Sequence, residues 1–218
     1  MNTKRIIFWA CFIVILALIV WGLIAAMNKT PGTGVKSGVP APVTTADYVR
    51  GNFDAPVTVI EYEDFQCPAC GEYFPIVERM FNESSSTVRL VFRHFPLSQH
   101  PNAIPAAEAS EAASIQGKFW QMYSLLYANQ TDWSEKSHVD AETIFDGYAT
   151  TLGLDLTKFR ADETASTTLA KITAQEDEGN KIGINHTPTY FVNGKEVSPT
   201  SYEDFKAIVD AAATSTAQ

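Results

Sequence analysis

The chain has 218 residues, of which 45% are hydrophobic, enough for one globular domain with further segments attached. Its formal net charge of −9 argues against a nucleic-acid partner, because binding phosphates requires clustered Lys and Arg residues. Its three cysteines are too few for a small scaffold held together by disulfides.

The first hydrophobic segment, from Ile6 to Met27, contains no charged residue and follows Lys4 and Arg5. As a helix it would measure about 33 Å, enough to cross a hydrocarbon core of roughly 30 Å. It is longer than the apolar part of most secretory signals and ends without a clear cleavage motif. We therefore predict a transmembrane anchor at residues 6–27, with residues 1–5 in the cytoplasm and the rest of the chain outside it. A cleaved signal peptide is the alternative.

Residues 28–47 contain six glycine and proline residues among small polar ones and show no apolar period. This composition predicts a flexible linker. We expect the globular domain to occupy residues 48–213, followed by a short tail at residues 214–218.

A buried strand is predicted at Val57 to Tyr62, and the sequence Cys67-Pro68-Ala69-Cys70 follows it. Two cysteines at this spacing can form a disulfide or remain a dithiol, so the pair can exchange two electrons. Apolar residues then recur at helical spacing, and Pro68 suits the first position of a helix. Unpaired N–H groups at the start of a helix stabilise a thiolate, so Cys67 is expected to be a reactive nucleophile.

A second strand is predicted at Val88 to Phe95. The chain from about residue 103 to residue 183 then contains mainly helical signals. The expected helices are 106–115, 119–128, 141–152 and 156–182. A helical block of this length between strand signals predicts an inserted helical subdomain.

Strand signals return at Thr189 to Val192, and Asn193-Gly194 predicts a tight hairpin turn into Lys195 to Val197. Thr200 and Glu203 form a predicted capping box at the start of the last helix. The order is therefore strand, cysteine helix, strand, helical block, hairpin and helix. This order predicts an α/β protein with a thioredoxin-like fold and a helical insertion.

Five separated stretches of the globular part form a further pattern. They are GNFDAPV at 51–57, EYEDFQCPAC at 61–70, FRHFPL at 92–97, ANQTDW at 128–133 and GINHTPTYFVNGK at 183–195. In order and spacing they resemble the DsbA-like thiol:disulfide oxidoreductases of the thioredoxin superfamily. The resemblance runs from about residue 47 to residue 213, and five motifs are more specific than two cysteines alone.

The resemblance implies a role for each site residue. Cys67 resembles the exposed attacking cysteine and Cys70 the buried resolving one. Pro188 resembles the cis-proline that faces the disulfide across a substrate cleft, with Thr187 just before it. Glu61 matches the acidic residue beneath the disulfide that assists proton movement at the buried cysteine.

The dipeptide between the cysteines departs from the strongly oxidising members, which often have His there. Here the dipeptide is Pro68-Ala69, which is also expected to border the substrate cleft. Because it has no imidazole to stabilise the Cys67 thiolate, we expect a milder oxidant. His186, beside Thr187, is a possible tuning residue for the thiolate. Glu63 and Asp64 can be plain solvated loop charges, and His94 is expected to be a structural histidine with its hydrogen bonds satisfied.

These features lead to one main functional hypothesis. The chain introduces disulfides into exported client proteins that have free thiols, and a membrane redox partner reoxidises the Cys67–Cys70 pair. No cofactor beyond this cysteine pair is expected. The nearest alternative is a reductase or isomerase that works in the opposite direction outside the cytoplasm.

Two alternatives belong to other classes. A structural zinc site would need about four ligands, and apart from Cys67 and Cys70 no close ligand pair appears in the sequence. No metal site is therefore predicted. A non-catalytic peptide-binding module that kept the fold would bind clients without its cysteines, and the intact Cys67, Cys70 and Thr187-Pro188 weigh against it.

Overall fold

We describe residues 38–216 in a computed structural model of the chain. The predicted membrane anchor and the cytoplasmic end therefore lie outside the described residues. Within residues 38–216, no helix combines the length and the apolar character needed to cross a membrane.

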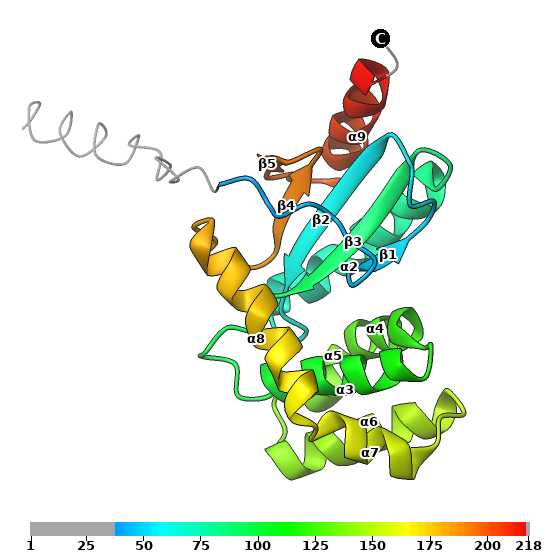
Figure 1. The fold of residues 1–218 in the computed structure, drawn as a ribbon, viewed down its shortest axis with the longest axis vertical. Coiled ribbons are helices and arrows are strands. Elements are labelled where there is room, and N and C mark those ends of the chain that lie inside the picture. The colour runs from blue at the N-terminus through cyan, green and yellow to red at the C-terminus, as the bar shows by residue number, and fades with distance from the viewer. Residues whose placement is uncertain (1–37, 217–218) are drawn as a thin grey trace, which may run out of the picture. The chain divides into compact units, whose positions relative to one another are not determined.

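A five-stranded mixed sheet forms the centre of the domain, in the order β1-β3-β2-β4-β5 (Figure 1). Its central strands β2 and β3 are parallel, and the other three neighbouring pairs are antiparallel. The strands are β1 (Tyr48–Arg50), β2 (Val57–Glu63), β3 (Val88–His94), β4 (Thr189–Val192) and β5 (Lys195–Val197). The four strands expected from the sequence, β2 to β5, all form, whereas β1 was not predicted. With three residues, β1 is too short to show a period and depends on pairing with β3.

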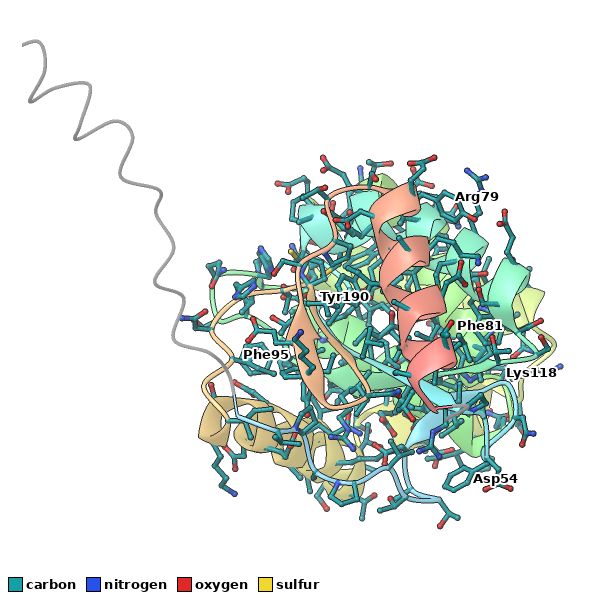
Figure 2. The ribbon with its side chains drawn as sticks, turned by 90° about the horizontal axis from the view of Figure 1, so that it is seen from above. Asp54, Arg79, Phe81, Phe95, Lys118 and Tyr190 are labelled. Carbon is teal, nitrogen blue, oxygen red and sulfur yellow. The ribbon has the colours of Figure 1, made fainter. Side chains whose placement is uncertain are left out.

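Helices cover both faces of this sheet. One face packs against α2 (Pro68–Ser84) and α9 (Tyr202–Thr216). The other face packs against the C-terminal part of α8 (Ser166–Lys181) and the residues that follow it. Phe81 and Phe95, both labelled in Figure 2, belong to the apolar clusters on the two opposite faces. The hairpin turn is also confirmed, because Asn193 and Gly194 both have positive φ angles, as the predicted turn requires.

The predicted helical insertion is confirmed and lies to one side of the sheet (Figure 1). It consists of α3 (Ala103–Ile115), α4 (Phe119–Ala128), α5 (Gln130–Trp133), α6 (His138–Thr151), α7 (Leu156–Glu163) and α8. The single helix expected at residues 156–182 is wrong, because the chain breaks between α7 and α8. Near this break the Thr168 hydroxyl donates to the Asp162 carbonyl at 2.6 Å, and hydroxyl side chains of this kind compete with helical backbone bonds.

Two other local predictions need correction. The cap of α9 lies one residue later than expected, because the Asp204 N–H donates to Ser201 Oγ at 3.1 Å. Part of the predicted flexible linker is ordered: Gly38 N–H donates to the Ile182 carbonyl at 2.6 Å, and Ala41 N–H donates to Glu178 at 2.8 Å. The segment shows no apolar period because it is irregular backbone, held by backbone hydrogen bonds together with single side chains such as Asp47.

Candidate active site

The two cysteines lie where the end of β2 meets the start of α2. Cys67 is the N-cap of α2, with an extended backbone, and Pro68 takes the first helical position as predicted. The loop is held by Asp64, whose carbonyl accepts from Cys67 N–H at 3.0 Å and whose carboxylate accepts from Gln66 N–H at 2.7 Å. This arrangement fixes the position of the Cys67 sulfur relative to the helix.

The cysteines are in the dithiol form and have unequal surroundings. Cys67 is 6% exposed and Cys70 is fully buried, so Cys67 is the one that a substrate can reach. The pKa of Cys67 is lowered to about 5, first by a hydrogen bond from the Cys70 thiol, while burial acts in the opposite direction. Burial raises the pKa of Cys70 well above that of an ordinary thiol. At neutral pH the pair is therefore one thiolate and one thiol.

Thr187 and Pro188 lie against this pair, and the bond between them is cis. The Cys67 sulfur lies 3.5 Å from the Thr187 carbonyl oxygen. The Thr187 side chain lowers the Cys67 pKa, as do the backbone N–H groups of Cys70 and Ala69. The structure thus brings together four residues predicted from separate motifs: Cys67, Cys70, Thr187 and Pro188.

A small pocket of about 140 Å³ lies beside the cis-proline. Its lining includes Tyr73, His186, Thr187, Pro188 and Pro199. The His186 ring is exposed and its Nδ1 lies 3.0 Å from the Asn185 side chain, so its tuning role stays a prediction.

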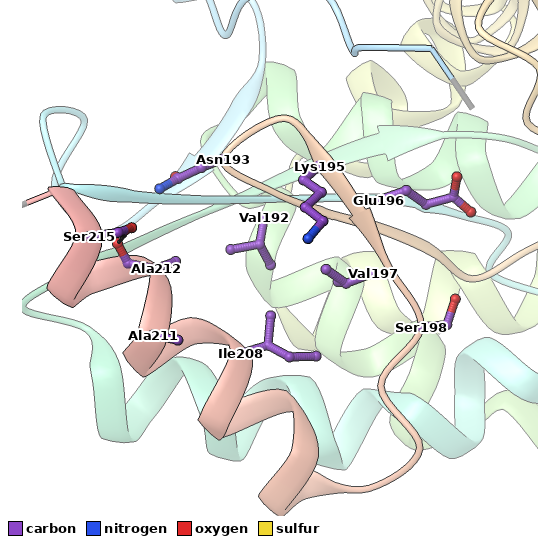
Figure 3. A pocket seen from close by; sticks show the side chains of 10 residues that line it. All are labelled: Val192, Asn193, Lys195, Glu196, Val197, Ser198, Ile208, Ala211, Ala212 and Ser215. Atoms are coloured by element: carbon purple, nitrogen blue, oxygen red, sulfur yellow. Dashed lines mark hydrogen bonds between the residues drawn. The ribbon is translucent and has the colours of Figure 1, made fainter. Parts of the chain in front are cut away.

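A larger groove of about 650 Å³ lies between β5 and α9 (Figure 3). Val192, Val197 and Ile208 give it apolar walls, and Lys195 lies at its edge. The groove is formed without either cysteine, so the chemistry of the pair is not located there.

Three acidic residues at the end of β2 are buried: Glu61, Glu63 and Asp64 are 0%, 1% and 2% exposed. The expectation that Glu63 and Asp64 are solvated loop charges is therefore wrong. Glu63 accepts hydrogen bonds from Tyr127 at 2.6 Å and Tyr190 at 3.0 Å. These hydroxyls come from α4 and β4, far away in the sequence, which is why the local sequence gave no sign of them.

Glu63 and the cysteine pair act on each other through their charges. The negative charge of Glu63 raises the pKa of Cys70, and the Cys67 thiolate in turn raises the pKa of Glu63. Glu61 lies two residues earlier on the same face of β2, and its role at the buried cysteine stays a prediction. One feature of the sequence could have pointed to Glu63. Side chains alternate along a strand, so residues 61 and 63 lie on the same face, and a role expected for Glu61 could have been considered for Glu63 as well.

Two side-chain amides, those of Gln66 and Gln130, connect the cysteine loop to the helical insertion. Gln66 Nε2 donates to the Ser134 carbonyl at 2.6 Å, and Gln66 Oε1 accepts from Asn102 N–H at 2.6 Å. Gln130 Nε2 donates to the carbonyls of Phe65 at 2.7 Å and Cys67 at 2.9 Å. Gln66 and Gln130 lie within two of the five motifs, but sequence reasoning gave them no role, because a neutral amide has no distinctive pattern.

His94 has the structural role predicted for it. It is 1% exposed, and its Nε2 lies 3.0 Å from the carboxylate of Glu111 in α3. His100 lies 2.6 Å from the Asp64 carboxylate. In the part of the chain that the structure describes, no three His, Cys, Asp or Glu side chains are grouped as a metal site would require.

Comparison with known proteins gives matches over the globular part. The family described as thioredoxin matches residues 44–211. The Na⁺/H⁺ antiporters NhaA 1 of Salinispora arenicola and NhaA 3 of Salinispora tropica are 41% and 42% identical to this chain over 150 residues, which is 68% of the chain. The match covers 22% of each antiporter, so the chain spans about a fifth of the length of these relatives.

Solved structures share the architecture. A thioredoxin-like oxidoreductase from Silicibacter pomeroyi is 28% identical, with a TM-score of 0.66 over 78% of this chain and 94% of that one. Oxidised BdbD from Bacillus subtilis is 24% identical, with a TM-score of 0.69 over 82% and 98% of the two chains. α-DsbA1 from Wolbachia pipientis is 21% identical, with a TM-score of 0.70 over 81% and 94%. The last two likenesses show the fold.

Proposed function

Because this chain belongs to the thioredoxin family and has the DsbA-type architecture of a thiol-disulfide oxidoreductase, we propose that it introduces disulfides into exported proteins. In the oxidised form, a client thiolate attacks the Cys67 sulfur. The Cys67–Cys70 bond breaks, and a mixed disulfide forms between Cys67 and the client. A second client thiol then displaces Cys67, which leaves the client oxidised and the pair reduced.

The observation that carries this proposal is the placement of Cys67 at the start of α2, next to the buried Cys70 thiol and the residues around the cis Thr187–Pro188 bond, a setting that lowers the Cys67 pKa to about 5. A thiol with a low pKa is a good leaving group, and a stable thiolate favours the reduced form of the pair. The value lies between about 7 for thioredoxin, a reductant, and about 3.5 for DsbA, a strong oxidant. A lowered pKa supports oxidation of clients, and the redox potential measures how strong an oxidant the pair is.

The proposed setting follows from the sequence. The predicted span at residues 6–27 would hold the domain at the outer side of the membrane, where client proteins emerge with free thiols. A membrane redox partner would reoxidise Cys67–Cys70 after each cycle. Extracytoplasmic location, clients and partner all belong to this proposal.

Cysteine variants of the full chain test the chemistry. With a reduced peptide that has two cysteines, the wild type should form the peptide disulfide, and Cys67→Ser should form none. With the oxidised form of the same peptide, reduced Cys70→Ser should accumulate a mixed disulfide: the Cys67 thiolate attacks the peptide disulfide and releases one peptide thiol, and the resolving thiol is missing. Cys11→Ser, in the predicted membrane span, is the matched control and should keep its activity. Full activity in Cys67→Ser would contradict the proposal.

The direction of electron flow needs a separate measurement. Equilibration with glutathione gives the redox potential of the pair. A potential well above that of thioredoxin, which is about −270 mV, supports the oxidase. A potential at or below that value would identify a reductant and overturn the proposed direction while leaving the exchange chemistry intact.

A further inference from the structure

Two buried carboxyl groups occupy neighbouring positions on one face of β2. Glu61 and Glu63 are 0% and 1% exposed, and a buried carboxylate is costly unless it is paired or neutralised. The two oxygens of Glu63 accept from the Tyr127 and Tyr190 hydroxyls. Both oxygens of Glu61 lack a hydrogen-bond partner among the described residues. The hydrogen bonds therefore favour a carboxylate at Glu63 and a neutral acid at Glu61.

The charged and titratable neighbours of the pair support this division. Glu61 faces Glu63 on its own strand, Glu78 of α2, Tyr123 of α4 and Arg50 of β1. Burial, followed by the charges of Glu63 and Glu78, raises the pKa of Glu61 well above its usual range. The Tyr123 hydroxyl acts weakly in the opposite direction but lies outside hydrogen-bond geometry.

Glu63 has different neighbours and titrates near neutral pH. It faces Tyr127 of α4, Tyr190 of β4, Cys67, Cys70 and the adjacent Asp64, as well as Glu61. Burial raises its pKa to about 7, although the two tyrosine hydrogen bonds lower it. The thiolate at Cys67 raises it as well, so Glu63 binds a proton more tightly when the cysteine pair is reduced.

We propose that Glu63, held by Tyr127 and Tyr190, takes up a proton when the Cys67–Cys70 disulfide is reduced and releases it when the disulfide re-forms. Glu61 stays neutral behind it and acts as a positioning residue. The inference rests on the proposed function, because it concerns the same redox reaction, and it assigns the proton exchange to a residue other than the one implied by family resemblance.

The proposed step balances atoms and charge. A client dithiol supplies two electrons and two protons as its own disulfide forms and the Cys67–Cys70 bond breaks. One proton goes to Cys70, which becomes a buried thiol. Cys67 remains a thiolate and does not take the second proton. Over a pH interval around 7, Glu63 takes it, and outside that interval the proton is released to water.

The dependence of the redox potential on pH tests this proposal, with the full chain equilibrated against glutathione from about pH 5.5 to pH 9. For the wild type, the slope of the redox potential against pH should be steeper around neutral pH, where it corresponds to two protons per two electrons. On the alkaline side the slope should correspond to one proton per two electrons. Glu63→Gln should show one proton throughout. Glu61→Gln should keep the steeper region, because it replaces a group that is already neutral.

Other variants guard against a failure to fold and against a general effect of losing a buried acid. Tyr127→Phe removes a hydrogen bond to the Glu63 carboxylate, so it should move the steeper region to higher pH. Glu111→Gln, a buried acid in the His94 contact, should leave the slope unchanged, and circular dichroism checks that each variant is folded.

The possible failures are distinguishable. If the steeper region disappears in Glu61→Gln and persists in Glu63→Gln, Glu61 exchanges the proton and the inference is wrong. It is also wrong if the wild type shows one proton over the whole range. If the wild type does not equilibrate with glutathione at all, the proposed function itself fails.

Discussion

At the scale of single residues, the most informative contrast is between the two cysteines. They share one turn of helix, yet the pKa of one is lowered and that of the other is raised. The hydrogen bond from Cys70 stabilises the Cys67 thiolate, while burial, followed by that same hydrogen bond, holds the proton on Cys70. Each cysteine therefore helps to set the state of the other, and no imidazole is needed.

Alkylation of the reduced protein should show this difference. The rate at Cys67 should follow a titration with a midpoint near pH 5, because only the thiolate reacts, and Cys70 should stay unmodified through pH 8. Mass spectrometry after iodoacetamide treatment identifies the modified cysteine at each pH. A midpoint near 8.5, the value for an ordinary thiol, would contradict the assigned stabilisation.

The same titration affects the stability of the reduced protein. The folded pKa of Cys67 is below its unfolded value, so its contribution is fully present above the unfolded pKa and is lost as the pH falls through about 5. The free energy of unfolding of the reduced wild type, relative to reduced Cys67→Ser, should therefore increase from pH 5 to pH 8. Urea titrations at several pH values measure this difference, and a difference independent of pH would contradict the prediction.

Sequence reasoning could find the residues of this site that lie in contiguous motifs. Cys67, Cys70 and Pro188 belong to such motifs. The structure has Cys70 buried and a cis bond at Pro188, whereas Cys67, expected to be exposed, is only 6% exposed because Thr187 lies against it. Glu63 is different, because its burial depends on two tyrosines supplied by α4 and β4. Local sequence shows that a carboxyl is present, but a tertiary contact decides whether it meets water or two hydroxyl groups.

At the scale of elements, the contact between α2 and α5 depends on a glycine. A Cβ atom added at Gly71 would overlap the side-chain amide of Gln130, which holds the carbonyls of Phe65 and Cys67. In contrast, a Cβ added at Gly147 in α6 would meet no atom within 4 Å. The two helical glycines thus provide a matched comparison.

We predict opposite effects for the two alanine substitutions. Gly147→Ala should stabilise the protein by up to about 1 kcal/mol, the usual gain in helix propensity. Gly71→Ala should destabilise it by roughly 1 kcal/mol, because two hydrogen bonds worth about 0.5–1.5 kcal/mol each are lost against that gain. Urea unfolding measures both effects.

A double-mutant cycle assigns the cost to Gln130. In a Gln130→Ala background the obstacle is removed, so Gly71→Ala should become stabilising, as Gly147→Ala is. If Gly71→Ala remains equally destabilising in that background, Gln130 is not the group that requires glycine at this position.

The existence and order of most elements could be predicted, since each has an apolar period or a specific turn signal. Boundaries were less accurate for physical reasons. The cap of α9 is at Ser201 rather than Thr200. Both residues have a hydroxyl group that can cap a helix, so the local sequence does not distinguish them. The break between α7 and α8 lies in a run of Ser and Thr, whose side chains bond to the backbone in ways that apolar periodicity does not register.

At the scale of the whole molecule, Arg93 joins three separate parts of the chain. Its guanidinium donates to Asp47 at 2.9 Å, to the Tyr62 hydroxyl at 2.9 Å and to the Ala41 carbonyl at 3.0 Å. It also lies 3.5 Å from Glu178 of α8. The side chains of Arg93 and Asp47 are 5% and 8% exposed, so this is a buried ion pair. It holds the segment at residues 38–47 against the sheet and α8.

Replacing Arg93 with Met should destabilise the protein by roughly 3–5 kcal/mol, because it leaves Asp47 buried without its charged partner. Lys158→Met, which breaks an exposed pair with Asp162, should cost at most about 0.5 kcal/mol. Thermal and urea unfolding of both variants measure these costs. A cost for Arg93→Met as small as that of the control would mean that the buried pair contributes nothing to holding the segment.

The amide contacts of Gln66, Asn102 and Gln130 also limit how the domain can be re-engineered. A thioredoxin core with an insertion looks modular, as if one helical block might be exchanged for another of equal length. In this chain, however, the insertion supplies part of the scaffold on which the nucleophile rests. A chimera with a foreign insertion would therefore need to reproduce Asn102, Gln130 and the Ser134 carbonyl at their present positions. Without them, the graft would retain both cysteines on a loop with fewer of its present supports.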